Sequence, residues 1–163
     1  MGDTLTLKDM RIVAALAFCA LVTCSAYAGD APSISPSAKD KCRVCGMFVA
    51  KYPDWTCCIT FKGSPNVYFD GPKDMFTYLQ NPGKYAAKQP TGSAIKVKDY
   101  YSLKTIDGRK AFYVAGGDVY GPMGRELVPF AKEADAKGFL ADHKGNKVFR
   151  FDEVTPAVVR SLE

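Results

Sequence analysis

The residues with the clearest chemical potential lie in the segment Cys42–Met47, which reads Cys-Arg-Val-Cys-Gly-Met. Two thiolates separated by two residues can bind a single ion, and Gly46 allows the backbone to bend tightly beside them. Met47 adds a thioether. Because thiolates and thioethers are soft ligands, this set favours Cu(I) over hard ions such as magnesium or calcium. The segment therefore predicts a soft-metal site.

Other uses of Cys42 and Cys45 stay open on spacing alone, since such a pair also forms disulfides, redox dithiols and halves of zinc sites. The chain has a further adjacent pair, Cys57 and Cys58. On a strand these two point to opposite faces, so the sequence does not favour a four-cysteine zinc site. A thioredoxin-like dithiol is also disfavoured, because the first pair precedes strands instead of lying between a strand and a helix.

Met123 is the second candidate ligand, because it follows Gly121-Pro122 in a tight connection that can leave its side chain in a cleft. The alternative is that Met123 fills core space, as methionine often does. Met75 shares a helical face with Leu79 and is predicted to be core. His143, the single histidine, is expected in the last turn of a helix, where an imidazolium interacts favourably with the helix dipole. Metal ligation is the less favoured role for His143.

The sequence contains no recognisable catalytic set. There is one histidine, and neither a Gly-x-Ser-x-Gly, a Walker nor a dinucleotide-binding motif is present. Asp70, Asp74 and Asp118 lie beside glycines and turns, where turn formation and helix capping explain them. We therefore expect a protein that is not an enzyme.

The N-terminus is typical of an exported protein. Arg11 precedes the apolar stretch 12–23, and Ala26-Tyr27-Ala28 places small residues where signal peptidase requires them. Residues 1–28 are therefore predicted to be a signal peptide, which gives a periplasmic product. The alternative is a membrane-anchored lipoprotein lipidated at Cys24, although Thr23 fits a lipobox poorly.

Charge and composition limit the function classes. The net charge is +5 with 47% apolar residues, which suffices for one folded domain. Lysine and arginine are scattered, so a solvated surface explains them better than nucleic-acid binding. Four cysteines remain after the predicted cleavage, and in an exported protein an even number first suggests disulfides.

The first half of the chain predicts two strands, a helix and a third strand. Residues 29–41 are rich in Ser, Pro and Ala and predict a flexible tether, so the folded domain is expected at 42–163. In the half spanning about 42–100, strands are predicted at 56–61, 66–70 and around 95–97. Gly71-Pro72 begins the helix, and Pro82-Gly83 ends it.

The second half, about 101–163, predicts the same order. A strand at 110–115 is followed by a tight turn at Gly116-Gly117 and a returning strand at 118–120. Gly121-Pro122 precedes a helix at 129–143 and a strand at 147–151, and Thr155 caps a C-terminal helix. The predicted fold is α+β, with two pseudo-duplicated ββαβ units of mainly antiparallel sheet and a C-terminal helix.

Together these residues resemble the NosL-like nitrous oxide reductase accessory family. The matching motifs are Cys42–Met47, Tyr68-Phe69-Asp70-Gly71 and the segment 118–130, Asp-Val-Tyr-Gly-Pro-Met-Gly-Arg-Glu-Leu-Val-Pro-Phe. The resemblance implies two ββαβ units, an exported location and Cu(I) bound by Cys and Met for delivery to reductase maturation. It also implies a distant likeness to part of organomercurial lyase. The family is commonly lipidated, and Cys57-Cys58 is not part of its pattern, so that pair could form a disulfide, bind a second soft ion or be inert.

Two hypotheses follow from the sequence. In the first, the protein is a copper(I) chaperone that uses Cys42, Cys45, Met47 and Met123 and delivers Cu(I) to nitrous oxide reductase maturation proteins or another copper client. In the second, it is a disulfide-stabilised periplasmic interaction domain without metal transfer. No nucleic-acid partner is expected, and a membrane is involved only if Cys24 is lipidated.

Overall fold

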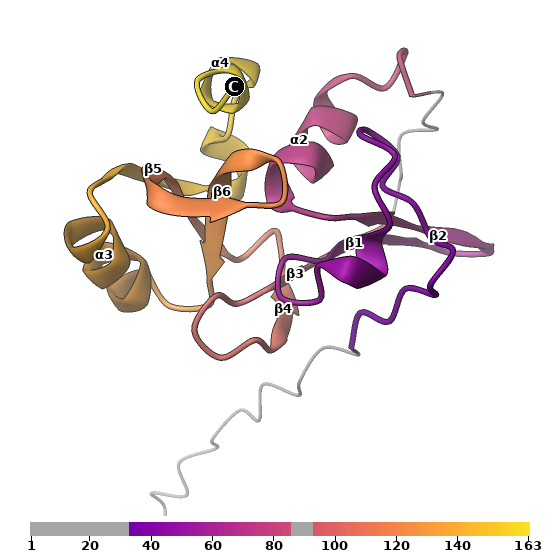
Figure 1. The fold of residues 1–163 in the computed structure, drawn as a ribbon, viewed down its shortest axis with the longest axis horizontal. Coiled ribbons are helices and arrows are strands. Elements are labelled where there is room, and N and C mark those ends of the chain that lie inside the picture. The colour runs from indigo at the N-terminus through magenta and orange to yellow at the C-terminus, as the bar shows by residue number, and fades with distance from the viewer. Residues whose placement is uncertain (1–32, 86–92) are drawn as a thin grey trace, which may run out of the picture.

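The computed structural model describes residues 33–85 and 93–163, and Figure 1 shows their arrangement. The predicted signal peptide and the possible lipidation site Cys24 lie outside the described residues. No helix within the described ranges is long and apolar enough to cross a membrane. The fold combines helices with two antiparallel sheets, and α3 lies at the opposite end of the molecule from the β1–β2 hairpin (Figure 1).

The first sheet contains four strands in the order β2-β1-β3-β4. A short 3-10 helix, η1 (Val49–Lys51), precedes it. The strands of this sheet are β1 (Cys57–Phe61), β2 (Ser64–Phe69), β3 (Ala94–Lys98) and β4 (Thr105–Asp107), and helix α2 (Pro72–Gln80) lies between β2 and β3 in the chain. Gly71 is the N-cap of α2 and Pro72 its first residue, as predicted, because proline lacks the N–H that the first turn leaves unpaired.

The second sheet contains three strands in the order β6-β5-β7. The strands are β5 (Phe112–Gly121), β6 (Gly124–Phe130) and β7 (Gly145–Arg150), and helix α3 (Glu133–Asp142) lies between β6 and β7 in the chain. The 3-10 helix η2 (Phe151–Glu153) and helix α4 (Pro156–Arg160) follow β7. The hydroxyl of Thr155 accepts the backbone N–H of Val158, so the predicted cap of the C-terminal helix is present.

The two halves share one topology, which confirms the predicted ββαβ duplication. In each sheet the first strand of the unit lies in the middle. Its hairpin partner lies on one side, and the strand that follows the helix lies on the other. All pairings in the two sheets are antiparallel. Within the described ranges, β4 is an addition to the first unit without a counterpart in the second.

The predicted reversal at Gly116-Gly117 is wrong. Strand β5 continues through both glycines, and the chain reverses at Gly121–Gly124. The two glycines form an irregularity in the pairing, with φ of +80° and +96°. A Cβ on Gly117 would lie 2.7 Å from the carbonyl oxygen of His143, so glycine is required for close backbone approach and not for a turn.

The second helix is shorter than predicted at its start. Helix α3 begins at Glu133, and Pro129 belongs to β6 instead of the helix. Strand β6 lies at an edge of its sheet, where a proline costs no ladder hydrogen bond. The carbonyl of Pro129 accepts the N–H of Tyr100, which links the connection between β3 and β4 to this edge.

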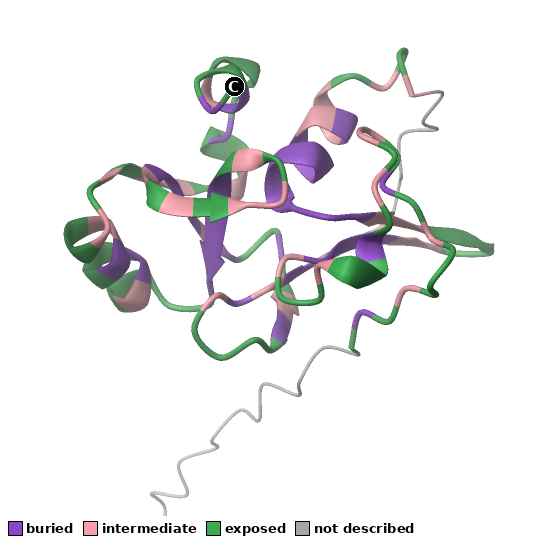
Figure 2. Cartoon of the chain, in the orientation of Figure 1, coloured by how far each residue is buried: buried purple, intermediate pink, exposed green. Residues whose placement is uncertain are grey.

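Strand β5 joins the two hydrophobic clusters of the protein. Tyr113 packs into the cluster around α2 and the first sheet, while the next residue, Val114, packs under α3. Adjacent strand residues face opposite sides of a sheet, so one strand serves both clusters. Met75 is fully buried in the first cluster, as predicted. Figure 2 shows the buried residues along the strands and on one side of α3.

The described part of the predicted tether contacts the domain. Ile34 is buried, and the carbonyl of Asp40 accepts the N–H of Val49 at 3.0 Å. Lys41 pairs with Phe48 in a β-bridge. Burial of an apolar side chain offsets the entropy of ordering such a segment, which a composition rich in Ser, Pro and Ala does not reveal. The domain boundaries of the sequence analysis stay a prediction.

Candidate metal site

The loop that carries Cys42 and Cys45 is closed by backbone hydrogen bonds. The β-bridge between Lys41 and Phe48 joins its two ends. Inside it, the N–H of Cys42 donates to Met47 at 2.8 Å, and the N–H of Gly46 donates to Cys42 at 3.0 Å. Gly46 has a φ of +80°, which glycine adopts without a Cβ clash. The tight bend therefore presents both thiols from one short loop.

The start of α2 supplies two carboxylates opposite this loop. Asp70 directly follows β2, and Asp74 lies in the first turn of the helix. Negative charge is favourable at that position because the first turn leaves backbone N–H groups unpaired. The Gly71-Pro72 junction thus places two acids four residues apart at one helix start.

These four side chains meet in what we call the Cys–Asp cluster. Cys42 Sγ donates to Asp74 Oδ2 at 3.1 Å, and Cys45 Sγ lies 3.4 Å from both carboxylate oxygens of Asp70. One donor atom from each residue lies within 4.8 Å of all the others. Cys42, Asp70 and Asp74 are buried, whereas Cys45 is partly exposed. The cluster can therefore surround one ion, with Cys45 on its open side.

Burial controls the protonation of the cluster. It raises the pKa of Cys45 to about 12 and that of Cys42 further, and it raises the pKa of Asp74 as well. Without a metal, both thiols are protonated at neutral pH and donate to the carboxylates. An incoming metal ion must displace these protons to bind thiolate.

The second half of the protein closes over the start of α2. The ammonium group of Lys73 donates to the carbonyl of Met123 at 2.7 Å, and the backbone N–H of Lys73 donates to the carboxylate of Glu126. Glu126 is buried, which raises its pKa to about 8. Its carboxylate lies so near Gly71 that a Cβ there would overlap it. The helix start is therefore fixed from both halves of the chain.

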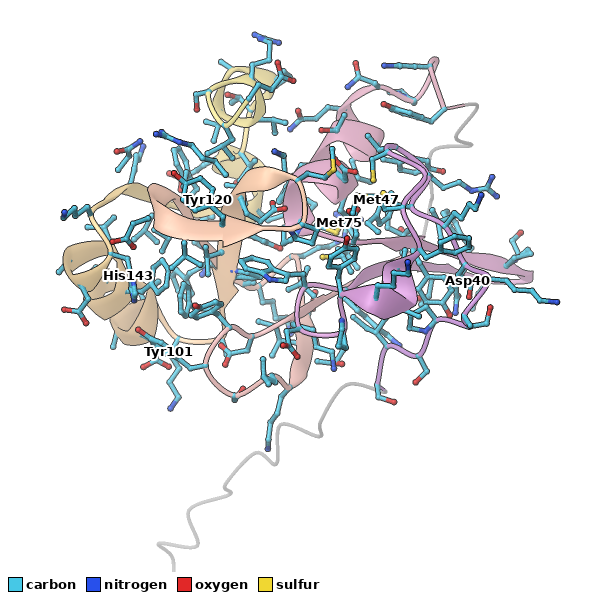
Figure 3. The ribbon with its side chains drawn as sticks, in the orientation of Figure 1. Asp40, Met47, Met75, Tyr101, Tyr120 and His143 are labelled. Atoms are coloured by element: carbon cyan, nitrogen blue, oxygen red, sulfur yellow. The ribbon has the colours of Figure 1, made fainter. Side chains whose placement is uncertain are left out.

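Of the two predicted methionine ligands, one lies in the cysteine loop and the other in the turn of the β5–β6 hairpin. Met47 is partly buried in the cysteine loop, and Met123 is 44% exposed at the tip of the β5–β6 hairpin. The Lys73 hydrogen bond holds the backbone of Met123 against the start of α2. Figure 3 shows Met47 and buried Met75 on the same side of the molecule. The structure thus brings the Cys42–Met47 loop and the Met123 turn to the same helix end.

His143 lies apart from this cluster. Figure 3 places it at α3, at the far end of the view from Met47. Its Nδ1 lies 3.0 Å from a carboxylate oxygen of Asp118, and its ring stacks on Phe139 with centroids 4.3 Å apart. These contacts account for the side chain without a metal.

The remaining cysteines are buried in the first sheet. Cys57 lies in the first hydrophobic cluster and donates to the carbonyl of Trp55 at 3.3 Å. Cys58 is its buried neighbour on β1. All four cysteines within the described ranges are free thiols, so nothing in this structure supports the disulfide-stabilised alternative.

Asp70 and Asp74 are the site residues that the sequence analysis did not identify. It assigned them to turn formation and capping, roles that a carboxylate beside glycine usually has. One available signal was their spacing of four residues across the Gly71-Pro72 junction, which puts both on the same side of a helix start. What the sequence could not reveal was that this junction faces the cysteine loop.

Residues 33–159 match the NosL family. The chain belongs to this family. It is similar to the copper-binding lipoprotein NosL of Stutzerimonas stutzeri, with 27% identity over 151 residues that cover 78% of this chain and 70% of that relative. The crystal structure of the copper chaperone NosL from Shewanella denitrificans matches with a TM-score of 0.64 and 26% identity, over 78% of this chain and 99% of that one.

A further NosL structure, the solution structure of apo-NosL from Achromobacter cycloclastes, is 27% identical to this chain. It covers 63% of this chain and 87% of its own, with a TM-score of 0.43. The α+β arrangement of this NosL family member agrees with the crystal structure from Shewanella denitrificans.

Proposed function

We propose that this chain is an exported copper(I)-binding accessory protein that carries Cu(I) to a copper client and has no catalytic activity of its own. One observation carries the proposal: the donor atoms of Cys42, Cys45, Asp70 and Asp74 lie within 4.8 Å of one another. The names of its relatives, a copper-binding lipoprotein and a copper chaperone, support copper as the metal.

In this proposal the two thiolates of Cys42 and Cys45 bind Cu(I), because soft sulfur suits a soft ion. Carboxylates are hard ligands, so Asp70 and Asp74 act mainly as hydrogen-bond acceptors for the thiols of the metal-free protein, and the thiol protons pass to solvent when the metal binds. The hydrogen bonds from each thiol to an aspartate support this role. The acids also keep the local charge favourable for a cation.

Release of Cu(I) to a client requires at least one ligand that binds the ion weakly. Met47 and Met123 supply thioethers, which bind Cu(I) less strongly than thiolates and which a recipient's ligand can displace. Met123 is exposed, and Cys45 is the less buried thiol, so both are open to an approaching partner. Nitrous oxide reductase maturation is the client process that we favour, with another copper enzyme as the alternative.

Export is proposed from the signal sequence at residues 1–28, with the periplasm as the destination. The relative named a lipoprotein supports an anchored form as the alternative, in which Cys24 carries the lipid. Intact mass of the exported protein separates the two. A mature N-terminus at Gly29 supports the soluble form, and acyl mass on Cys24 supports the anchored form.

The function is tested by titrating reduced protein with Cu(I) against a chromogenic chelator. We expect one tightly bound Cu(I) per chain. Cys45→Ala should abolish tight binding, and Met47→Leu and Met123→Leu should each weaken it without unfolding the protein. Cys57→Ser and Cys58→Ser are the controls that leave the stoichiometry unchanged. If Cys45→Ala binds Cu(I) as tightly as the wild type, the proposed site is wrong.

Zinc is the competitor that the test must include, since two thiolates and two carboxylates also suit a tetrahedral zinc ion. Adding Cu(I) and zinc together shows which of the two metals the site prefers. Retention of Cu(I) in excess zinc supports the copper proposal. Displacement of Cu(I) by zinc would instead indicate that the carboxylates act as ligands.

A further inference from the structure

The loop that carries the metal-binding cysteines is surrounded by exposed cations. Within the described residues, Lys39, Lys41, Arg43 and Lys51 are all exposed, and none of them forms an ion pair with a described residue. The nearest acid along the chain, Asp40, accepts the backbone N–H of Ser37 at 2.6 Å. The loop therefore presents positive charge that the described protein does not neutralise.

An exposed aromatic ring lies among these cations. Phe48 is 40% exposed, with Lys41 Nζ 4.9 Å and Lys51 Nζ 5.7 Å from its ring centroid. The β-bridge between Lys41 and Phe48 fixes this arrangement at the base of the cysteine loop. We call the surface formed by Lys39, Lys41, Arg43, Phe48 and Lys51 the basic face.

Two hollows flank the bridge. One, of about 390 Å³, is lined by three cations and one acid, with Cys42 and Tyr68 of β2 among its other members; the charged residues are Lys39, Asp40, Lys41 and Arg43. The other, of about 410 Å³, is lined by Ala38, Phe48, Ala50 and Lys51. The first hollow is lined in part by Cys42, so an occupant of the basic face would lie close to the cysteine loop.

We propose that the basic face docks an acidic polypeptide segment of the copper-exchange partner, one that carries a methionine or cysteine. This inference rests on the proposed function, because the partner's soft side chain receives or supplies the Cu(I). Opposite charges accelerate encounter and fix orientation, which suits a carrier that must bind and then leave. The exposed ring of Phe48 and the two hollows offer a surface into which side chains of the docked segment can fit.

The same features favour a protein segment over an anionic membrane. A membrane-binding surface presents protruding apolar side chains, whereas here the basic face is hollowed and two lysines lie over Phe48. Metal exchange also needs a ligand atom to arrive beside Cys45, which a lipid headgroup does not supply.

The test uses two synthetic peptides, one rich in Glu and Asp with two methionines and one with Lys in place of the acids. Cu(I)-loaded wild type, the double variant Lys41→Glu/Lys51→Glu and the control Lys147→Glu are mixed with each peptide, and transfer is followed by stopped flow. The control is matched because Lys147 also lies over an aromatic ring, 4.9 Å from the centroid of Phe149 on β7.

We expect the double variant to transfer Cu(I) to the acidic peptide at least about tenfold more slowly than wild type, with the salt dependence of the rate lost. The control should behave as wild type, and affinity for Cu(I) alone should be unchanged in both. Equal transfer rates for wild type and double variant would overturn the proposal. So would salt-dependent binding to vesicles of anionic phospholipid without binding to the acidic peptide.

Failure of the copper proposal is distinguished from failure of the docking proposal by measuring how the fluorescently labelled acidic peptide binds to metal-free protein. If the wild type binds no Cu(I) but binds this peptide, and the double variant does not bind the peptide, the docking proposal is supported and the copper proposal is wrong. If Cu(I) binds tightly but the peptide does not, the basic face has no such partner.

Discussion

The ammonium group of Lys73 donates to the backbone carbonyl of Met123 at 2.7 Å and so ties the start of α2 to the tip of the β5–β6 hairpin. Lys73 lies between Asp70 and Asp74 in the sequence, so the bond anchors the hairpin beside the Cys–Asp cluster. The backbone of Met123 is held while its side chain stays 44% exposed. The side chain of Met123, which is a proposed ligand, can therefore change its conformation while its backbone stays anchored.

We therefore expect Lys73→Ala to lower the Cu(I) affinity by roughly tenfold, comparable to the loss of a charged hydrogen bond. Chelator competition measures the affinity, and amide hydrogen exchange at Gly121–Gly124 reports loosening of the hairpin. Lys132→Ala, at an exposed lysine before α3, is the control. Unchanged exchange at the hairpin tip in Lys73→Ala would show that the bond does not anchor it.

Copper affinity should rise with pH. The pKa of Cys45 is raised to about 12 and that of Cys42 further, so both thiols carry protons at neutral pH and must release them to bind metal. Affinity is then expected to increase by about tenfold per pH unit for each thiolate bound. Competition with a chelator of known proton affinity, repeated over a pH series, measures the slope. A flat profile would mean that no thiol proton is displaced.

The Asp74→Asn variant tests whether Asp74 acts as a hydrogen-bond acceptor for a thiol or as a ligand of the metal. The negative charge of Asp74 adds to burial in raising the pKa of Cys45, so removal of this charge should lower that pKa. We expect the affinity profile of Asp74→Asn to shift to lower pH while tight binding persists. Loss of affinity at every pH would instead identify Asp74 as a ligand of the ion.

Glu126 should make the metal-free protein less stable as pH rises. Burial raises its pKa from the ordinary 4.5 to about 8 in the folded state. Between these values the native state retains a proton that the unfolded chain releases, so stability falls with increasing pH through this window. Glu126→Gln should remove this loss, on the order of a few kcal/mol, and be more stable than wild type near the upper end.

Urea unfolding over a pH series measures this difference. Glu133→Gln is the matched control, because Glu133 is exposed on α3 and its ion pair with Lys137 lowers its pKa. A wild type whose pH dependence parallels that of Glu126→Gln would show that the buried carboxylate does not titrate in this range.

Local signals determined which features the sequence could predict. Gly71-Pro72 and Thr155-Pro156 marked both helix starts correctly, because N1 proline and N-cap threonine act within one turn. Gly116-Gly117 misled the prediction, since those glycines allow close approach to His143 and the reversal lies four residues later. The cysteine loop was recognised from its own spacing. Its partners Asp70 and Asp74 were missed, because their role depends on contacts between segments about thirty residues apart.

Gly71 offers a test of the contact between the two halves. A Cβ at this position would overlap the buried carboxylate of Glu126, so Gly71→Ala should destabilise the protein by about 1–3 kcal/mol. Gly138→Ala is the control, since Gly138 lies within α3 with open space around it and alanine there should stabilise by roughly 1 kcal/mol. Thermal unfolding of both variants should shift in opposite directions. Equal shifts would contradict the proposed contact.

The contact between Glu126 and the start of α2 also orders events during synthesis of the chain. All four members of the Cys–Asp cluster have been made once residue 74 is complete, yet the groups that fix the helix start, at Met123 and Glu126, emerge about fifty residues later. A nascent chain of intermediate length thus carries every sulfur and carboxylate of the cluster but not the clamp that seats them. The start of α2 therefore gains its contacts from the second half only after residue 126 has been made.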